Sequence, residues 1–183
     1  MKKYISTLLA LVMVFSLTAC GGTAAESTEA PALKLEGTME ELVTQVVEKN
    51  PVEFMGDFMP TDLTDTSEDG IMAIQSFTGL QDTTRIQDIA AYEPMMGSIA
   101  FSLVMVRVNE GEDVAAVAGE MKSGIDQRKW ICVEADDLML ASFGDVVMLI
   151  MVASSSGMTA QSFVDAFQSV CAAQYEGAEV IVH

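Results

Sequence analysis

The sequence contains a single histidine, His183, and it is the last residue of the chain. Chain ends are commonly frayed, so this residue is poorly placed to act as a general base or as a zinc ligand. The sequence also lacks G-x-S-x-G, G-x-G-x-x-G and Walker patterns. These absences argue against histidine-dependent hydrolases, nucleotide-binding proteins and histidine-rich zinc proteins.

Basic residues are also scarce, since nine lysines and arginines stand against 27 aspartates and glutamates. Two of the nine are Lys2 and Lys3, so the chain after residue 20 has seven basic and 27 acidic residues and a net charge of −20. Binding to phosphate depends on lysine and arginine, which excludes nucleic acid as an expected partner. The acidic charge favours solubility, and it is also compatible with a cationic or basic ligand.

The first twenty residues have the pattern of an export signal. Lys2 and Lys3 precede an apolar run over residues 4–17, which is shorter than the roughly 20 residues that span a membrane. The run ends in Leu17-Thr18-Ala19-Cys20, which resembles the lipobox of bacterial lipoproteins. That resemblance implies cleavage before Cys20, diacylglycerol on its thiol, and anchoring by acyl chains to the outer face of the bacterial cell membrane. No other segment resembles a membrane span.

Composition divides the rest of the chain into two parts. Residues 20–37 are small, polar and acidic, with no aromatic residue, which predicts a flexible tether behind a signal peptide over residues 1–19. Residues 38–183 are enough for one domain with its own core. This domain contains Cys132 and Cys171, which allow either one disulfide or two free thiols. Cys171 shares a helical apolar stripe with Phe163 and Phe167, which favours free thiols.

Hydrophobic periodicity predicts an α+β fold. Thr38 and Glu41 have capping-box spacing before an apolar stripe, and the Asn50-Pro51 pair predicts the end of this first helix. The predicted order is an N-terminal helix, a short helix and then β-β-α-β-β-α, with a mostly antiparallel sheet and helices packed on one face. The remaining helices are predicted at 68–79, 112–128 and 159–173, and the four strands of this order at 86–93, 99–108, 138–143 and 146–152. The tail is predicted to add a further short strand at 178–182.

A hairpin sets the register of this predicted sheet. Gly144-Asp145 separates two strand-like runs, and glycine at the first central position permits the positive φ that a two-residue turn needs. Residues 146–152 are apolar on both alternating faces, so the turn must fix the register, with Phe143 opposite Val146.

The lipobox, acidic tether, apolar strand IAFSLVMVRV, helix from Glu112 and Gly144 turn before VVMLIMV together resemble a family of small lipoproteins of Gram-positive bacteria. The resemblance covers roughly residues 77–170 and rests mostly on core pattern. That family is a domain of unknown function, so it implies fold and location and supplies no catalytic residues.

Three groups of side chains are candidates for a site. Residues 65–70, DTSEDG, have the oxygen and glycine spacing of a calcium loop, but Ser76 stands where a bidentate glutamate belongs, so an Asp-rich turn is favoured. Asp136 and Asp137 follow Glu134, but neighbours on a strand point to opposite faces and should not converge. A contact patch is the third candidate, formed by basic residues around the only tryptophan: Lys122, Arg128, Lys129 and Trp130. Helix-dipole complementarity and core packing explain the same residues without a partner.

The sequence contains no nucleophile–base or metal signature, and it implies no cofactor. We therefore expect a membrane-tethered, extracytoplasmic domain that binds or assists an unknown protein or small molecule. Two alternatives stay open. One is the solute-binding component of a transporter, although such proteins are commonly longer. The other is a small cell-envelope hydrolase that uses two carboxylates.

The lipobox predicts that the mature chain begins at a lipidated Cys20. Mass spectrometry of the native protein should find a diacylglyceryl N-terminus on this residue, and a Cys20→Ala variant should leave the membrane fraction. A mature chain that begins elsewhere, or a membrane-bound Cys20→Ala variant, would contradict the lipobox interpretation.

Overall fold

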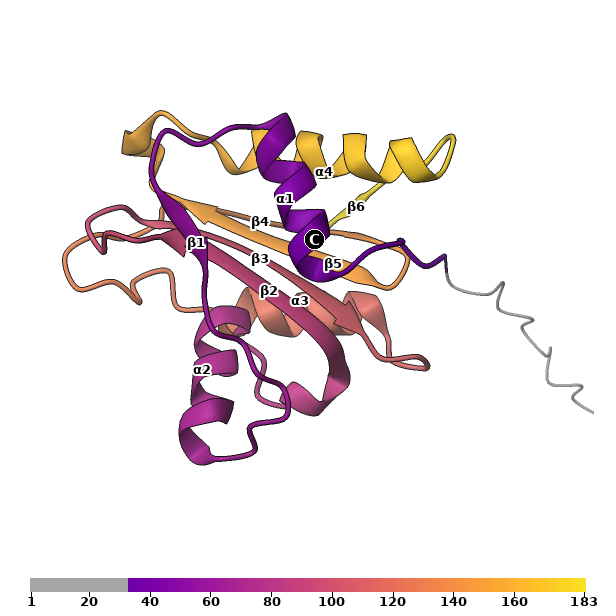
Figure 1. Cartoon of the computed structure of the whole chain (residues 1–183), viewed down its shortest axis with the longest axis horizontal. Coiled ribbons are helices and arrows are strands. Elements are labelled where there is room, and N and C mark those ends of the chain that lie inside the picture. The colour runs from indigo at the N-terminus through magenta and orange to yellow at the C-terminus, as the bar shows by residue number, and fades with distance from the viewer. Residues whose placement is uncertain (1–32) are drawn as a thin grey trace, which may run out of the picture. The chain divides into compact units, whose positions relative to one another are not determined.

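The computed structural model describes residues 33–183, so the signal, Cys20 and most of the predicted tether lie outside the described residues. The elements follow the predicted order, with one additional short strand near the start (Figure 1). They are α1 (Met39–Lys49), β1 (Gly56–Phe58), α2 (Glu68–Thr78), β2 (Ile86–Pro94), β3 (Phe101–Val108), α3 (Val114–Gly124), β4 (Asp137–Phe143), β5 (Val146–Val152), α4 (Ala160–Gln174) and β6 (Ile181–Val182). None of these helices is long and apolar enough to span a bilayer.

The strands form one antiparallel sheet in the order β1-β2-β3-β5-β4-β6. Phe143 pairs with Val146 across the predicted hairpin, and Gly144 has a φ of +58°. The strands β3 and β5 lie at the centre, and every residue of β5 is buried. The α+β class, the antiparallel sheet and the hairpin register are therefore confirmed.

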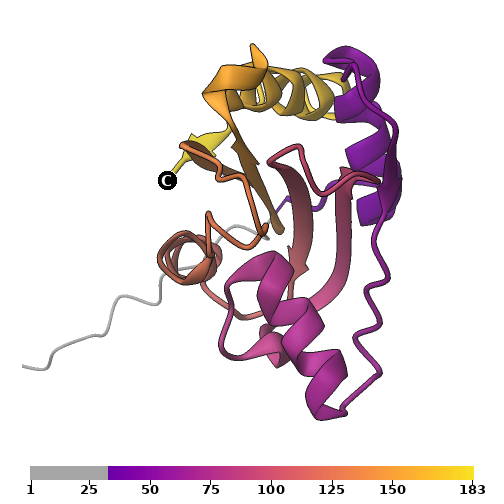
Figure 2. The same ribbon diagram turned by 90° about the vertical axis from the view of Figure 1, so that its left-hand side faces the viewer.

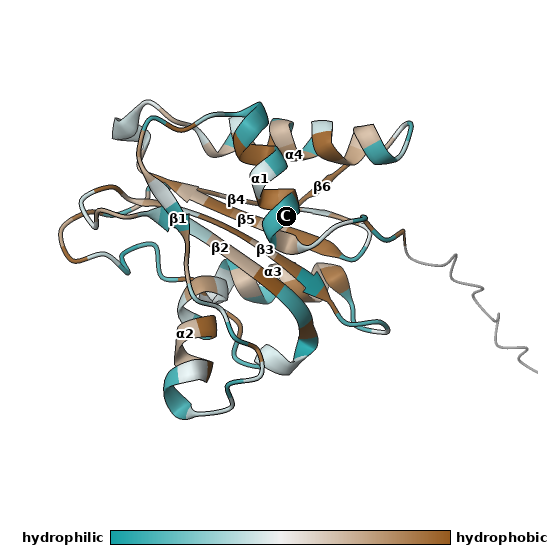
Figure 3. Cartoon of the chain, in the orientation of Figure 1, coloured by the Kyte–Doolittle hydropathy of each residue, from teal (hydrophilic) through white to brown (hydrophobic). Residues whose placement is uncertain are grey.

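The helices cover both faces of the sheet, so their predicted packing on one face is wrong (Figures 1 and 2). The helices α1 and α4 pack with Leu103 and Met105 of β3, whereas α2 and α3 pack with Val104 and Val106. The two central strands are apolar on both faces, as Figure 3 shows, and each face must be shielded from water. One layer of helices would have left half of that surface exposed.

The local signals for helix ends are mostly confirmed. Thr38 and Glu41 form the complete capping box of α1, and Gly79 ends α2 in the left-handed conformation. The helix α3 begins after Asp113, whose carboxylate caps it, and ends at Gly124, earlier than the predicted residue 128. A Cβ at Gly124 would lie 2.1 Å from the Gly79 carbonyl oxygen, so these two backbones approach as only glycine permits.

Residues 33–37 pack against the sheet and belong to the domain, so the tether predicted over 20–37 ends too late. Leu35 is buried, and the guanidinium of Arg107 donates to the carbonyl oxygens of Leu35 and Gly37, at 2.8 Å each. Arg107 also pairs with Asp145 at 2.7 Å, and the Asp145 amide donates to the Leu33 carbonyl. The hairpin turn and the arginine of β3 thus hold the segment that leads into α1.

The sheet consequently has two different ends. The proximal end carries residues 33–37 and the Gly144 turn, where β3 and β4 finish and β5 begins. At the opposite, distal end the connecting segments 50–55, 94–100, 126–136 and 153–159 gather. In Figure 1 the distal end lies at the left and the indigo segment enters at the right.

The two cysteines of the domain are unpaired, as predicted. Cys171 is buried in the core beneath α4, and burial raises the pKa of its thiol to about 12. Cys132 is exposed in the 126–136 loop. The native protein therefore presents one accessible thiol within the described domain, at the distal end.

Replacing Gly144 should test the hairpin and the docking of residues 33–37 together. A Cβ at Gly144 would lie 1.9 Å from the Leu33 carbonyl oxygen, in addition to the strain of a positive φ. Gly111 is a matched control, because its φ is +89° but nothing lies within 4 Å of its Cβ position. In urea unfolding, Gly144→Ala should be less stable than Gly111→Ala by about 1 kcal/mol or more. Equal losses would show that the contact with Leu33 contributes nothing.

Candidate binding groove at the distal end of the sheet

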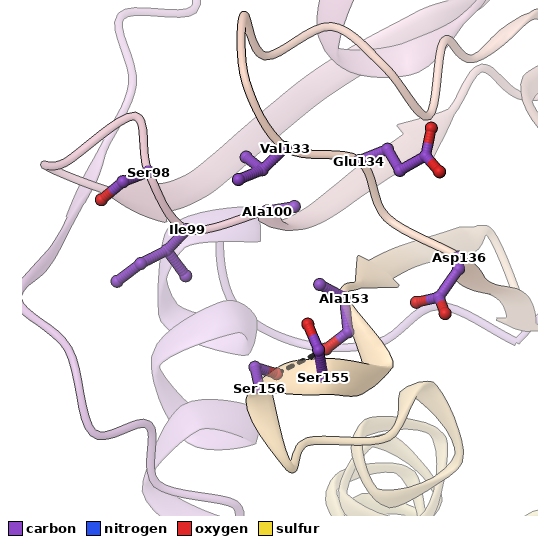
Figure 4. Close-up of a pocket in the computed structure, with 9 residues that line it drawn as sticks. All are labelled: Ser98, Ile99, Ala100, Val133, Glu134, Asp136, Ala153, Ser155 and Ser156. Atoms are coloured by element: carbon purple, nitrogen blue, oxygen red, sulfur yellow. Dashed lines mark hydrogen bonds between the residues drawn. The ribbon is translucent and has the colours of Figure 1, made fainter.

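Two adjoining cavities form a groove at the distal end, and they share Ile99 and Ser156. The first cavity has a volume of about 460 Å³ and lies between the β2–β3 connection, the 126–136 loop and the turn after β5 (Figure 4). The second, of about 690 Å³, continues between the end of α1 and the start of α4. We call the two cavities together the distal groove. Their volumes fall in the range typical of ligand sites.

Hydroxyls and carboxylates line the first cavity. The Asp136 carboxylate accepts hydrogen bonds from the Ser154 amide and hydroxyl, both at 2.6 Å, and these bonds lower the pKa of Asp136. Glu134 pairs with Arg128 at 3.2 Å, and Figure 4 shows its carboxylate turned away from the serines. As predicted, Asp136 and Asp137 do not converge, because Asp137 accepts a bond from the Ala160 amide at the start of α4.

The second cavity has an aromatic floor and a polar rim. Phe54 and Phe163 both pack edge-on against Phe101, with ring centroids 4.9 and 5.3 Å apart. Asn50 donates to the Ser162 hydroxyl at 3.0 Å, which joins the end of α1 to the first turn of α4. This packing fixes the floor of the groove and leaves Glu53 exposed at its edge.

The lining of the distal groove carries charge of one sign. Glu53, Glu134 and Asp136 line the two cavities, and no lysine, arginine or histidine is among the lining residues. Apolar side chains stand around this acidic lining in the distal loops. Ile131 is fully exposed, and Met55, Met95 and Met96 each expose more than half of their surface. Met55 and Met95 are neighbours, because the Met95 amide donates to the Met55 carbonyl.

A buried ion pair holds the loop that forms one wall of the groove. The Lys129 ammonium contacts the Glu93 carboxylate, and their side chains are only 14% and 12% exposed. The Ser102 hydroxyl donates to Glu93 at 2.6 Å, and the ammonium lies 4.9 Å from the centre of the Phe77 ring. Burial lowers the pKa of Lys129, and the carboxylate of Glu93 opposes that effect.

The base of the same loop is closed by two hydrogen bonds between Gln127 and Ala135, at 2.9 and 2.8 Å. The closed base and the buried Lys129 side chain together make residues 126–136 an ordered loop, with Ile131 at its exposed tip. Its residues Val133, Glu134 and Asp136 line the first cavity.

The predicted basic patch is not one surface. Lys122 lies in the last turn of α3 and donates to the His183 carbonyl oxygen at 2.6 Å. Arg128 is exposed and paired with Glu134, whereas Lys129 points inward and Trp130 is half-buried beside it. The separation arises because α3 ends at Gly124, so residues 126–130 follow the loop and share no helical face.

The Asp-rich segment caps a helix. Asp65 accepts from the Ser67 amide at 2.9 Å, and Ser67 in turn caps α2. Over residues 33–183, no group of three or more histidine, cysteine or acidic side chains is placed to hold a metal ion. The favoured interpretation as an Asp-rich turn agrees with these bonds.

Two polar clusters were missed by the sequence analysis. Ser102, Glu93 and Lys129 come together only because the sheet register places Ser102 beside Glu93. His183 is not frayed: its amide donates to Leu140, and its Nε2 lies 2.7 Å from the Ser142 hydroxyl oxygen.

The geometry of these clusters argues against nucleophilic catalysis by either serine. Ser102 has no exposed surface and Ser142 is 3% exposed, so a substrate cannot reach either hydroxyl in this conformation. Burial and the charge of Lys122 lower the pKa of His183, which favours a neutral ring at pH 7. In this conformation both clusters therefore hold neighbouring segments of the fold together.

Comparison with protein-family models, with curated proteins and with solved structures finds no match for this chain.

Removing the buried ammonium should be costly, because it leaves the Glu93 carboxylate without its partner. In urea unfolding, Lys129→Met should lose about 3 kcal/mol, and the double variant Lys129→Met with Glu93→Gln should recover part of that loss. Arg128→Met is the matched control, since its exposed pair should contribute less than about 1 kcal/mol. If Lys129→Met and Arg128→Met lose the same small amount, the buried pair does not hold the loop.

Proposed function

We propose that this chain is a lipid-anchored, extracytoplasmic binding protein that presents the distal groove to a partner. The observation that carries the proposal is that the connection to the lipobox and the groove lie at opposite ends of the domain. Residues 33–37, which connect to the lipobox, dock at the proximal end, and the groove lies at the other end of the sheet. An anchor on Cys20 would therefore attach the domain on the side away from the groove.

The groove favours this function over the two alternatives. A solute-binding component encloses most of its ligand, whereas exposed residues such as Ser98, Ser155 and Gly157 line these cavities. A glycan hydrolase needs two carboxylates that act on one bond from opposite sides. Here Glu134 is paired with Arg128 and Asp136 with Ser154, and their carboxylates do not face each other (Figure 4).

Photo-crosslinking in intact cells tests this function. A photoreactive benzoylphenylalanine in place of Ser98, in the first cavity, should give a crosslinked product of defined mass. The same group in place of Glu176, just after α4, should give none, because that helix ends toward the proximal end.

A second substitution distinguishes binding in the groove from chance contact. Adding Ser155→Trp, which fills the first cavity, should abolish the product, whereas Ser169→Trp on the exposed face of α4 should preserve it. In the same cells, a membrane-impermeant maleimide should label the exposed Cys132 before lysis. Labelling only after lysis, or crosslinks that do not depend on the groove, would contradict the proposed function.

A further inference from the structure

We infer that the occupant of the distal groove is an extended protein segment that carries lysine or arginine beside apolar side chains. This inference rests on the proposed function and names the class of its partner. It depends on the shape of the groove, on the sign of its charge and on the apolar side chains around it.

The open shape favours a macromolecule over a small solute. A small ligand in this groove would remain wetted on one side, because the rim residues Ser98 and Ser155 are exposed. The two cavities meet at Ile99 and Ser156, so one continuous chain can place a side chain in each. A protein segment also brings the bulk that excludes water from such a contact.

The charge favours a basic segment. The lining holds three carboxylates and no basic residue. Glu134 is paired with Arg128 outside the lining. Glu53 and Asp136 therefore supply the charge that no basic side chain of residues 33–183 pairs with, on a chain whose net charge beyond residue 20 is −20. Glu53 has no ion-pair or hydrogen-bond partner for its side chain among the residues of the described domain. This potential repels anionic lipid headgroups and acidic proteins, and it speeds the approach of cationic partners.

Exposed apolar side chains around the groove indicate that the bound segment also carries apolar residues. Ile131, Met55, Met95 and Met96 are exposed in the distal loops, and the floor of the second cavity is aromatic. Methionine side chains are flexible and polarizable, and they adapt to varied partners. A basic residue alone would leave these side chains in water, so the segment must carry apolar residues as well.

The experiment uses the full chain in phosphatidylcholine nanodiscs, with empty nanodiscs as background. The probe is a fluorescent ten-residue peptide of lysine, serine and two leucines, and its binding is followed by anisotropy. Two companion peptides replace every lysine by glutamate or both leucines by serine, and both should bind more weakly. Spermine, a small polycation, should not displace the first peptide at equal concentration.

Charge-matched variants locate the binding. Glu53→Gln with Asp136→Asn removes the two groove charges that no basic side chain of the described domain pairs with, and it should weaken binding about two- to twenty-fold. Glu40→Gln with Glu176→Gln removes two charges from α1 and the segment after α4, and it should leave the dissociation constant unchanged. Ile131→Ser should weaken binding, whereas Ile181→Ser, exposed on β6, should not.

Several results would overturn the inference. If the two double variants lost the same binding affinity, the peptide would be attracted by the net charge of the protein alone. If the glutamate peptide bound as tightly as the lysine peptide, a basic partner would be excluded. Tight binding of spermine would indicate that the groove takes a small solute. Stronger binding to nanodiscs with anionic lipid than to the peptide would indicate a membrane surface. If groove-dependent crosslinks persist in cells while the lysine peptide fails to bind, the partner class is wrong and the proposed function stands.

Discussion

The architecture depends on one constraint, which is that β3 and β5 are apolar on both faces. Each face must be covered, so α1 and α4 pack on one side and α2 and α3 on the other. With both faces occupied, the two ends, the edge strands β1 and β6 and the outer helix surfaces remain available to a partner (Figures 1 and 3). The proximal end is occupied by the docked residues 33–37, and the distal end carries the groove.

The second determinant is the buried pair of Lys129 and Glu93. Such pairs add little net stability, because removing two charges from water costs about as much as their attraction returns. Their effect is positional, since an ammonium that reaches a buried carboxylate fixes the backbone that carries it. The pair thus sets where Glu134 stands beside the groove and where Ile131 is exposed. A loop without this anchor would have many positions for the same residues.

Local signals in the sequence predict much of the fold. The capping box at Thr38, the helix end at Gly79 and the Gly144 turn depend on a few neighbouring residues, and each appears as predicted. The two-sided helix packing was missed even though the apolar pattern of residues 99–108 and 146–152 implied it. The groove could not be predicted, because Ile99 and Ser156 meet through the pairing of β3 with β5, and Glu53 joins them through the packing of α1 on α4. Lys129 was assigned to the surface for the same reason, since its partner Glu93 lies 36 residues away.

The groove as the binding face is the central claim, and amide hydrogen exchange of the full chain tests it most directly. Exchange would be measured with and without the saturating lysine–leucine peptide. The account predicts slower exchange over residues 94–100 and 153–159, which line the groove from two sides, and no change over residues 33–37 and the Gly144 turn. Protection at the proximal end, or an even change over the whole domain, would contradict it.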